Sequence, residues 1–183
     1  MSRQLVVRYS AWARVFHWLT AILVLAAFIL GPGGSEARVY DSSRDFDRQL
    51  HETLGLLVLG LTIIRLAWRA IDVRPEPAKV PNWMNITAKT VQFLLYVLLF
   101  AVPLTAITGA WLEGHPLTLM NGIRIAPIIA ESHATGETIA EIHTWLGDAI
   151  LWLAGFHAAA ALFHHYILRD KVLVSMLPGR SAK

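Results

Sequence analysis

Apolar residues dominate four long segments of the chain, and polar or glycine- and proline-rich stretches separate them. The segments run from about Trp12 to Leu30, Leu50 to Ala70, Thr90 to Leu112 and Ile142 to Leu168. A helix needs about 20 mostly apolar residues to cross a bilayer core of about 30 Å. The pattern therefore predicts an all-α fold, an integral membrane four-helix bundle that forms a single domain over residues 1–183.

The ends of the segments support this interpretation. The first segment is long enough to cross a bilayer, and the Gly31-Pro32-Gly33-Gly34 stretch after it is a poor match to a signal-peptidase site, so we expect a retained helix. Pro103 falls inside the third segment, where a membrane helix can tolerate a kink. The connection over residues 73–85 contains three prolines and predicts an extended strap. The connection over residues 113–141 shows no obvious secondary structure, which is typical of a functional or mobile loop.

Composition and charge add an orientation. The chain is 55% hydrophobic and 16% charged, with a mean hydropathy of +0.49. With the N-terminus inside, 12 of the 16 Lys and Arg residues lie inside, and the outer segments keep Arg38, Arg44, Arg48 and Arg124. The positive-inside rule therefore predicts an N-in, C-in topology with both termini cytoplasmic. The 12 basic residues on the inner side can contact anionic lipid headgroups, so we expect no nucleic-acid partner.

Four histidines lie within or at the ends of the apolar segments: His17, His51, His143 and His157. An ionisable side chain inside a membrane is costly and is by default a candidate for function. His143 and His157 are 14 residues apart, so they share one helix face and are separated by roughly 21 Å along the axis. His51 matches the depth of His143 on the outer side, and His17 matches that of His157 on the inner side. The sequence predicts two stacked histidine pairs.

Two imidazoles per site fit bis-histidine haem b better than zinc, which takes four protein ligands or three plus water. The methionines lie outside the apolar segments, and copper or non-haem iron would want further ligands at the same depth. Cysteine is absent, which excludes thiolate ligation and covalent haem attachment. For any single histidine, a structural hydrogen bond to a neighbouring helix remains an alternative.

Several other residues extend this pattern. Gly55 and Gly147 each follow a histidine by four residues, which leaves a side-chain-free patch for a flat ligand on the same face. Arg65 follows His51 by 14 residues, so it either pairs with a haem propionate or snorkels to the inner headgroups. His164 follows His157 by seven residues and either hydrogen-bonds a quinone or lies at the interface. The loop histidines, His115 and His133, are expected to be surface residues.

Taken together, these residues resemble the bacterial cytochrome b561 family of small four-helix di-haem membrane proteins. The resemblance covers nearly the whole chain and rests on residues 14–19 (RVFHWL), His51, residues 65–69 (RLAWR), His143 and, most specifically, residues 157–166 (HAAAALFHHY). It implies a bacterial inner-membrane protein with two haem b groups, one held by His17 and His157 and the other by His51 and His143. It also implies ubiquinone as electron acceptor, with Lys79 and His164 as candidate quinone-binding residues.

Some members of this family are superoxide oxidases, so the resemblance favours an oxidoreductase that passes electrons from superoxide to ubiquinone. Superoxide is an anion, and Arg44, Arg48 and Arg124 are the charges available to steer it. However, the outer segments carry eight acidic residues against four basic ones. The alternative is a cytochrome b subunit that relays electrons for a partner dehydrogenase or hydrogenase. A haem-free metal transporter is a third, remote interpretation.

Overall fold

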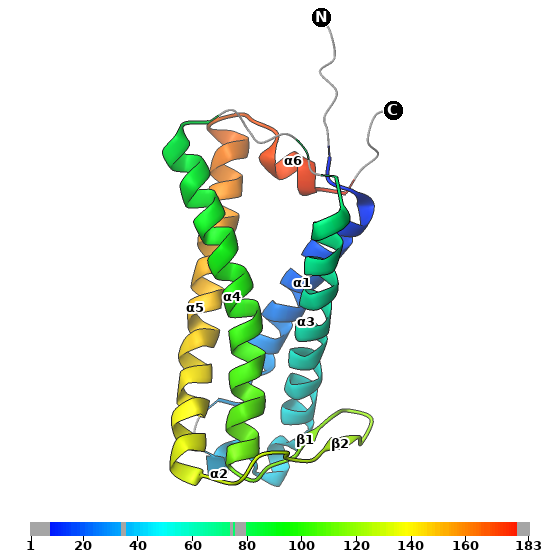
Figure 1. The fold of residues 1–183 in the computed structure, drawn as a ribbon, viewed down its shortest axis with the longest axis vertical. Helices are drawn as coiled ribbons and strands as arrows, with labels where there is room; N and C mark the ends of the chain where they lie inside the picture. The colour runs from blue at the N-terminus through cyan, green and yellow to red at the C-terminus, as the bar shows by residue number, and fades with distance from the viewer. Residues whose placement is uncertain (1–7, 34–35, 74, 76–79, 179–183) are drawn as a thin grey trace, which may run out of the picture.

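The computed structural model describes residues 8–33, 36–73, 75 and 80–178 (Figure 1). Within them, four helices are long and apolar enough to cross a membrane. They are α1 (Ala11–Leu30), α3 (Asp45–Ile71), α4 (Asn82–Leu112) and α5 (His133–Tyr166). This confirms the predicted all-α bundle of four spans. The shorter elements are α2 (Glu36–Val39), the 3₁₀ helix η1 (Ser42–Arg44), β1 (Leu117–Thr118), β2 (Arg124–Ile125) and α6 (Val172–Met176).

The four long helices form two pairs, in which α1 packs along α3 and α4 packs along α5 (Figure 1). The pairs meet chiefly between α3 and α4, whereas α1 and α5 have little direct packing. We call the end of the bundle with α6 the N-terminal end, and the end with α2, β1 and β2 the hairpin end.

Both ends of the described chain lie at the N-terminal end of the bundle. The Tyr9 amide donates to the Ser175 carbonyl at 3.2 Å, and the Arg8 guanidinium donates to the Leu177 carbonyl at 2.9 Å. An even number of crossings requires this arrangement. The N-in, C-in orientation itself remains a prediction.

The small core lies between the two pairs. Val58, Leu99 and Ile150 are buried there, one each from α3, α4 and α5. The fully buried Thr62 hydroxyl donates to the Val58 carbonyl at 2.7 Å, so it leaves no unsatisfied polar group. Large apolar side chains such as Trp152 and Phe156 point outward instead. That distribution is expected where lipid, rather than water, surrounds the protein.

The helices are longer than the apolar segments that predicted them. Helix α3 begins at Asp45 instead of about Leu50, α4 begins at Asn82 instead of about Thr90, and α5 begins at His133 instead of about Ile142. Hydropathy reports the part of a helix inside the bilayer, whereas its backbone hydrogen bonds continue into polar turns. In α3, Asp45 and Asp47 lie in the first turn, where negative charge complements the helix dipole.

The long connection after α4 does contain secondary structure, so the expectation of an irregular loop was wrong. Leu117 pairs with Ile125 and Thr118 pairs with Arg124 in an antiparallel hairpin. The first turns of α5 form the C-terminal part of this connection. Pro103 lies inside α4, as predicted for a membrane helix.

At the hairpin end, α5 packs directly against the end of α4. A Cβ added at the buried Gly136 would lie 2.7 Å from Glu113 Cγ and 3.0 Å from the Glu113 amide nitrogen. A Cβ at Gly109 would lie 3.2 Å from the Ala140 nitrogen. The two glycines therefore permit a helix contact that larger residues would force apart.

We expect Gly136→Ala to lower the free energy of unfolding by about 1–3 kcal/mol, because overpacking displaces the end of α4. Thermal unfolding of the purified protein in detergent would measure this effect. Gly60→Ala is the matched control, since a Cβ there meets nothing within 4 Å and alanine favours the helix. Equal melting temperatures for the two variants would contradict the close α4–α5 contact.

Candidate functional site

The structure brings the four predicted histidines together in two pairs. At the hairpin end, the rings of His51 on α3 and His143 on α5 have centroids 6.0 Å apart and planes at 83°. Toward the N-terminal end, the rings of His17 on α1 and His157 on α5 have centroids 6.3 Å apart and planes at 75°. Helix α5 therefore contributes one imidazole to each pair, and each pair bridges the two halves of the bundle.

The spacing of both pairs fits a shared metal ion. Two imidazoles that each bind a metal through nitrogen at about 2 Å have ring centroids roughly 6 Å apart. Among the described residues, no third His, Cys, Asp or Glu joins either pair to form a closed ligand group. Two imidazoles without a further protein ligand would suit haem, whose porphyrin supplies the remaining donors, whereas zinc would lack ligands.

The hydrogen bonds of the hairpin-end pair leave the Nε2 atoms of His51 and His143 available. His51 Nδ1 donates to the Ala27 carbonyl at 2.8 Å, and His143 Nδ1 donates to the Val102 carbonyl at 2.9 Å. A carbonyl oxygen can only accept, so each Nδ1 carries the hydrogen and each Nε2 keeps its lone pair. Ala27 belongs to the last turn of α1, where a carbonyl lacks a helical partner. The His51 ring N–H therefore supplies the hydrogen bond that the Ala27 carbonyl lacks within α1.

Open space adjoins the same pair. A Cβ added at Gly55 or Gly147 would meet nothing within 4 Å, although both glycines are half-buried. Each glycine lies one turn along the helix from its histidine, on the same face. The patch predicted for a large flat ligand is thus free of neighbouring atoms.

Arg65 points toward the pair nearer the N-terminal end. Its Nη2 donates to His17 Nδ1 at 3.1 Å, and its guanidinium carbon lies 5.4 Å from the centroid of the Tyr96 ring. Arginine has no acceptor, so His17 Nδ1 accepts in this arrangement. For His17 to bind a metal through Nε2 as a neutral imidazole, Arg65 must bond to another acceptor, such as a carboxylate.

The two predicted quinone-binding residues have different outcomes. His164, near the end of α5, contacts Asp170 Oδ2 through Nδ1 at 2.5 Å. The carboxylate therefore orients this imidazole, and Asp170 is a partner that sequence reasoning missed. Lys79 lies outside the described residues.

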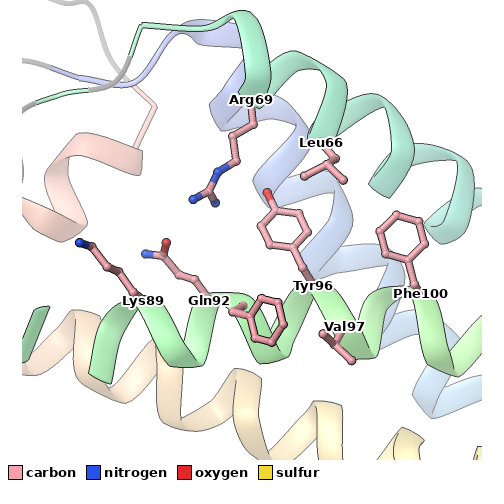
Figure 2. A pocket seen from close by; sticks show the side chains of 8 residues that line it. Leu66, Arg69, Lys89, Gln92, Tyr96, Val97 and Phe100 are labelled. Atoms are coloured by element: carbon pink, nitrogen blue, oxygen red, sulfur yellow. The ribbon is translucent and has the colours of Figure 1, made fainter. Parts of the chain in front are cut away.

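A groove between α3 and α4 lies near the N-terminal end and has a volume of about 430 Å³ (Figure 2). Figure 2 shows Arg69, Lys89 and Gln92 around one part of it and Val97 and Phe100 at the other. Tyr96 lies between these two parts; Leu66 and Phe93 complete the lining. The groove thus has a polar part and an apolar part.

Sequence reasoning missed this groove, although a local signal existed. Lys89, Gln92 and Tyr96 follow one another at spacings of three and four residues, which places them on one face of α4. Their polar character within a membrane helix could have identified that face. The second wall, formed by Leu66 and Arg69 of α3, depends on how the helices pack.

Two expectations about residues at the hairpin end, Arg48 and His115, were wrong. Arg48 was expected to be available for steering an anion, but it is buried and pairs with Asp45 at 2.6 Å and Glu52 at 3.0 Å. His115 was expected to be a surface residue, but it is half-buried and contacts Glu36 Oε1 through Nε2 at 2.6 Å. Its ring also stacks on Tyr40 with centroids 3.5 Å apart.

Glu113, which follows α4, also lies at this end of the bundle. Its partial burial raises the pKa of its carboxyl group, and the nearby Glu36 carboxylate raises the pKa further. Two acidic side chains are therefore held close together beside His115.

Comparison with known proteins gives the same picture over the length of the chain. The profile of the family described as prokaryotic cytochrome b561 matches residues 8–179. Cytochrome b561 homolog 2 of Escherichia coli (strain K12) is 30% identical over 178 residues, which cover 96% of this chain and 93% of that protein. Cytochrome b562 of Cereibacter sphaeroides is 32% identical, with 94% and 96% covered. A protein named probable superoxide oxidase CybB, from Yersinia pestis, is 25% identical, with 94% and 97% covered.

We expect His143→Ala to remove one haem and His157→Ala to remove the other, because each substitution deletes one imidazole of a different pair. Haem content per chain should fall to about half in each variant, and a redox titration should lose one of two one-electron steps. His133→Ala, at the exposed start of α5, is the control and should keep both. Unchanged haem content in both ligand variants would refute the assignment.

Proposed function

The chain belongs to the prokaryotic cytochrome b561 family of haem b electron-transfer membrane proteins, and on that premise we propose that it oxidises superoxide and reduces ubiquinone. In this proposal it carries two haem b groups, one between His51 and His143 and one between His17 and His157. The observation that supports it best is the arrangement of the histidines. Two imidazole pairs are stacked along α5, and in each pair the rings are spaced as they would be around a shared metal ion.

Haem b supplies one-electron redox chemistry when it is bound, and the chain supplies the positions. His51 and His143 hold their Nε2 atoms free through hydrogen bonds to backbone carbonyls. Arg65 is the cation next to the other pair. Arg65 would pair with an anionic propionate of the haem instead of His17 Nδ1, and the His17 imidazole would then be available as a ligand.

The proposed donor side is the hairpin end, which we assign to the outer face of the inner membrane. The name of the Yersinia pestis relative supports superoxide as donor. Two superoxide ions give up one electron each and become two O₂ molecules, and one ubiquinone takes up two electrons and two protons to become ubiquinol. Two redox centres suit this change from one-electron to two-electron chemistry. Since Arg48 is paired internally, Arg44 and the exposed Arg124 remain for steering.

The groove between α3 and α4 is the proposed acceptor site on the cytoplasmic side. Ubiquinone has a polar ring and an apolar tail, and the groove has a polar part with Arg69, Lys89 and Gln92 and an apolar part beyond Tyr96 (Figure 2). Tyr96 connects the groove to the interior, because Arg65 lies over its ring and contacts His17. Arg65 is therefore the one side chain between His17 and the groove-lining Tyr96.

Protons for the reduced quinone would come from the same end of the bundle. His164 is our candidate because Asp170 orients its ring, and an oriented imidazole can act as a proton shuttle. Lys79, which lies outside the described residues, is a second candidate. In the proposed orientation the end of α5 that carries His164 lies on the cytoplasmic side, where protons are taken up.

A second function follows from the charge of the hairpin end. The outer segments carry more acidic than basic residues, and Arg48 adds no free positive charge there. An acidic face suits a basic protein partner better than a small anion. The alternative is thus a membrane subunit that accepts electrons from a docked dehydrogenase or hydrogenase.

We expect superoxide to reduce the purified haem-loaded protein rapidly and ubiquinone to reoxidise it. Stopped-flow absorption with a superoxide source, with and without superoxide dismutase, measures the first step, and ubiquinol formation measures the second. The double variant His51→Ala/His143→Ala is the control and should lose superoxide-driven turnover. Reduction that requires an added partner protein would establish the relay function instead.

The groove assignment predicts that Gln92→Leu and Lys89→Met raise the KM for ubiquinone, because each removes a polar contact for the quinone ring. A loss of one such hydrogen bond corresponds to roughly a tenfold change. Haem content and reduction by dithionite should stay unchanged, and Trp152→Phe, on the exposed face of α5, should behave as wild type. If His164→Gln alone changes the KM while the groove variants do not, the quinone binds at α5 instead.

A further inference from the structure

Four side chains that could bind a cation meet at the hairpin end, outside both histidine pairs. Glu36 of α2, Glu113 after α4 and His115 offer ligand atoms that all lie within 4.8 Å of one another. His133, the first residue of α5, lies beside them, with Nδ1 3.9 Å from Glu36 Oε2. We call these four residues the hairpin-end cluster.

The backbone around the hairpin-end cluster is held in place. The Glu113 amide donates to the Gly109 carbonyl at 3.0 Å, and the His115 amide donates to the Ala110 carbonyl at 2.9 Å. Gly136 of α5 lies against Glu113 so closely that a Cβ could not fit. Tyr40 stacks on the His115 ring and limits its rotation. Such support reduces the ordering that a bound ion would otherwise require.

The charges of the hairpin-end cluster are unbalanced without a cation. Glu36 and Glu113 are both acidic, and the nearby Arg48 is engaged by Asp45 and Glu52. In the part of the chain that the structure describes, the ion-pair partners of Glu36 are His115 and His133, which carry charge only when protonated. With both imidazoles neutral, which is the form that binds a metal ion, the cluster carries only the negative charge of its carboxylates.

We infer that the hairpin-end cluster binds a divalent transition-metal cation of the zinc type. Two carboxylates with one or two imidazoles form a mixed oxygen and nitrogen ligand set, which suits zinc, whereas calcium and magnesium prefer oxygen alone. Two ligands of one tetrahedral zinc ion lie about 3.4 Å apart. The ligand atoms of Glu36, Glu113 and His115 lie within 4.8 Å of one another, so a shift of about 1 Å by each of them, through side-chain rotation, would bring them to that spacing.

The ion would fasten α2 to the connection between α4 and β1, over the end of the bundle that holds His51 and His143. Glu36 belongs to α2, Glu113 follows α4 and His115 precedes the β-hairpin. A contact chain continues inward, because the His115 ring stacks on Tyr40, and the Arg48 guanidinium lies 5.1 Å from the Tyr40 centroid. Arg48 in turn pairs with Glu52, the residue after His51. This inference does not depend on the electron donor or acceptor proposed above.

The test is a titration of the haem-loaded full-length protein with Zn²⁺ in detergent, after purification without a histidine tag. Isothermal titration calorimetry should show one site per chain. Glu113→Gln and His115→Gln should each weaken it about tenfold or more, whereas Glu141→Gln, an exposed carboxylate on α5 outside the cluster, should not. X-ray absorption at the zinc edge, which haem iron does not obscure, should show only nitrogen and oxygen ligands near 2.0–2.2 Å.

The haem spectrum separates this inference from the proposed function. Variants with intact haem bands and lost Zn²⁺ binding support the site and show that the fold is retained. Absence of stoichiometric Zn²⁺ binding in the wild-type protein with intact haem would overturn the metal site alone. Zn²⁺ binding that persists in Glu113→Gln/His115→Gln would place the ion elsewhere and would also overturn it.

Discussion

An imidazole inside a membrane must find partners for both of its nitrogens, and this requirement organises the bundle. His51 and His143 each donate Nδ1–H to a backbone carbonyl of a neighbouring helix, so each ring is held while its Nε2 keeps a lone pair, and the two ring centroids lie 6.0 Å apart. The two helix pairs otherwise share little packing between α1 and α5. The histidine pairs connect the two halves, so a ligand bound between the rings would also stabilise the assembled bundle.

The two ends of the bundle are built differently, and the difference fits the direction of electron flow that we propose. At the hairpin end, the pair is fixed by backbone carbonyls and covered by α2, the β-hairpin and the first turn of α5. Toward the N-terminal end, His17 contacts Arg65, and Arg65 leads through Tyr96 to an open amphipathic groove. A covered end suits a small donor or a docked partner, whereas an open groove between membrane helices suits a lipid-soluble acceptor.

Much of this architecture could be predicted because membrane helices have a strong local signature. A run of about 20 apolar residues identifies each span, and a separation of 14 residues puts His143 and His157 on one face regardless of the rest of the fold. The helix ends were less predictable, because α3, α4 and α5 continue through polar turns that hydropathy excludes. Arg48 and His115 were misjudged for a related reason. A charged or ionisable residue in an outer segment is exposed by default, unless distant partners such as Tyr40 and Glu36 bury it.

The sequence by itself determined the four spans, the depth of each histidine and the likeness to a family, because these depend on distance along one helix. Only the tertiary structure decided which ring nitrogens carry hydrogen, that Arg65 faces His17, and that Arg69 and Lys89 share a groove. It also decided that Glu36 contacts His115, which lies 79 positions further along the chain. Contacts of this kind depend on how far each helix is rotated about its axis and how the two helix pairs are placed. Periodicity along a single helix contains no information on either quantity.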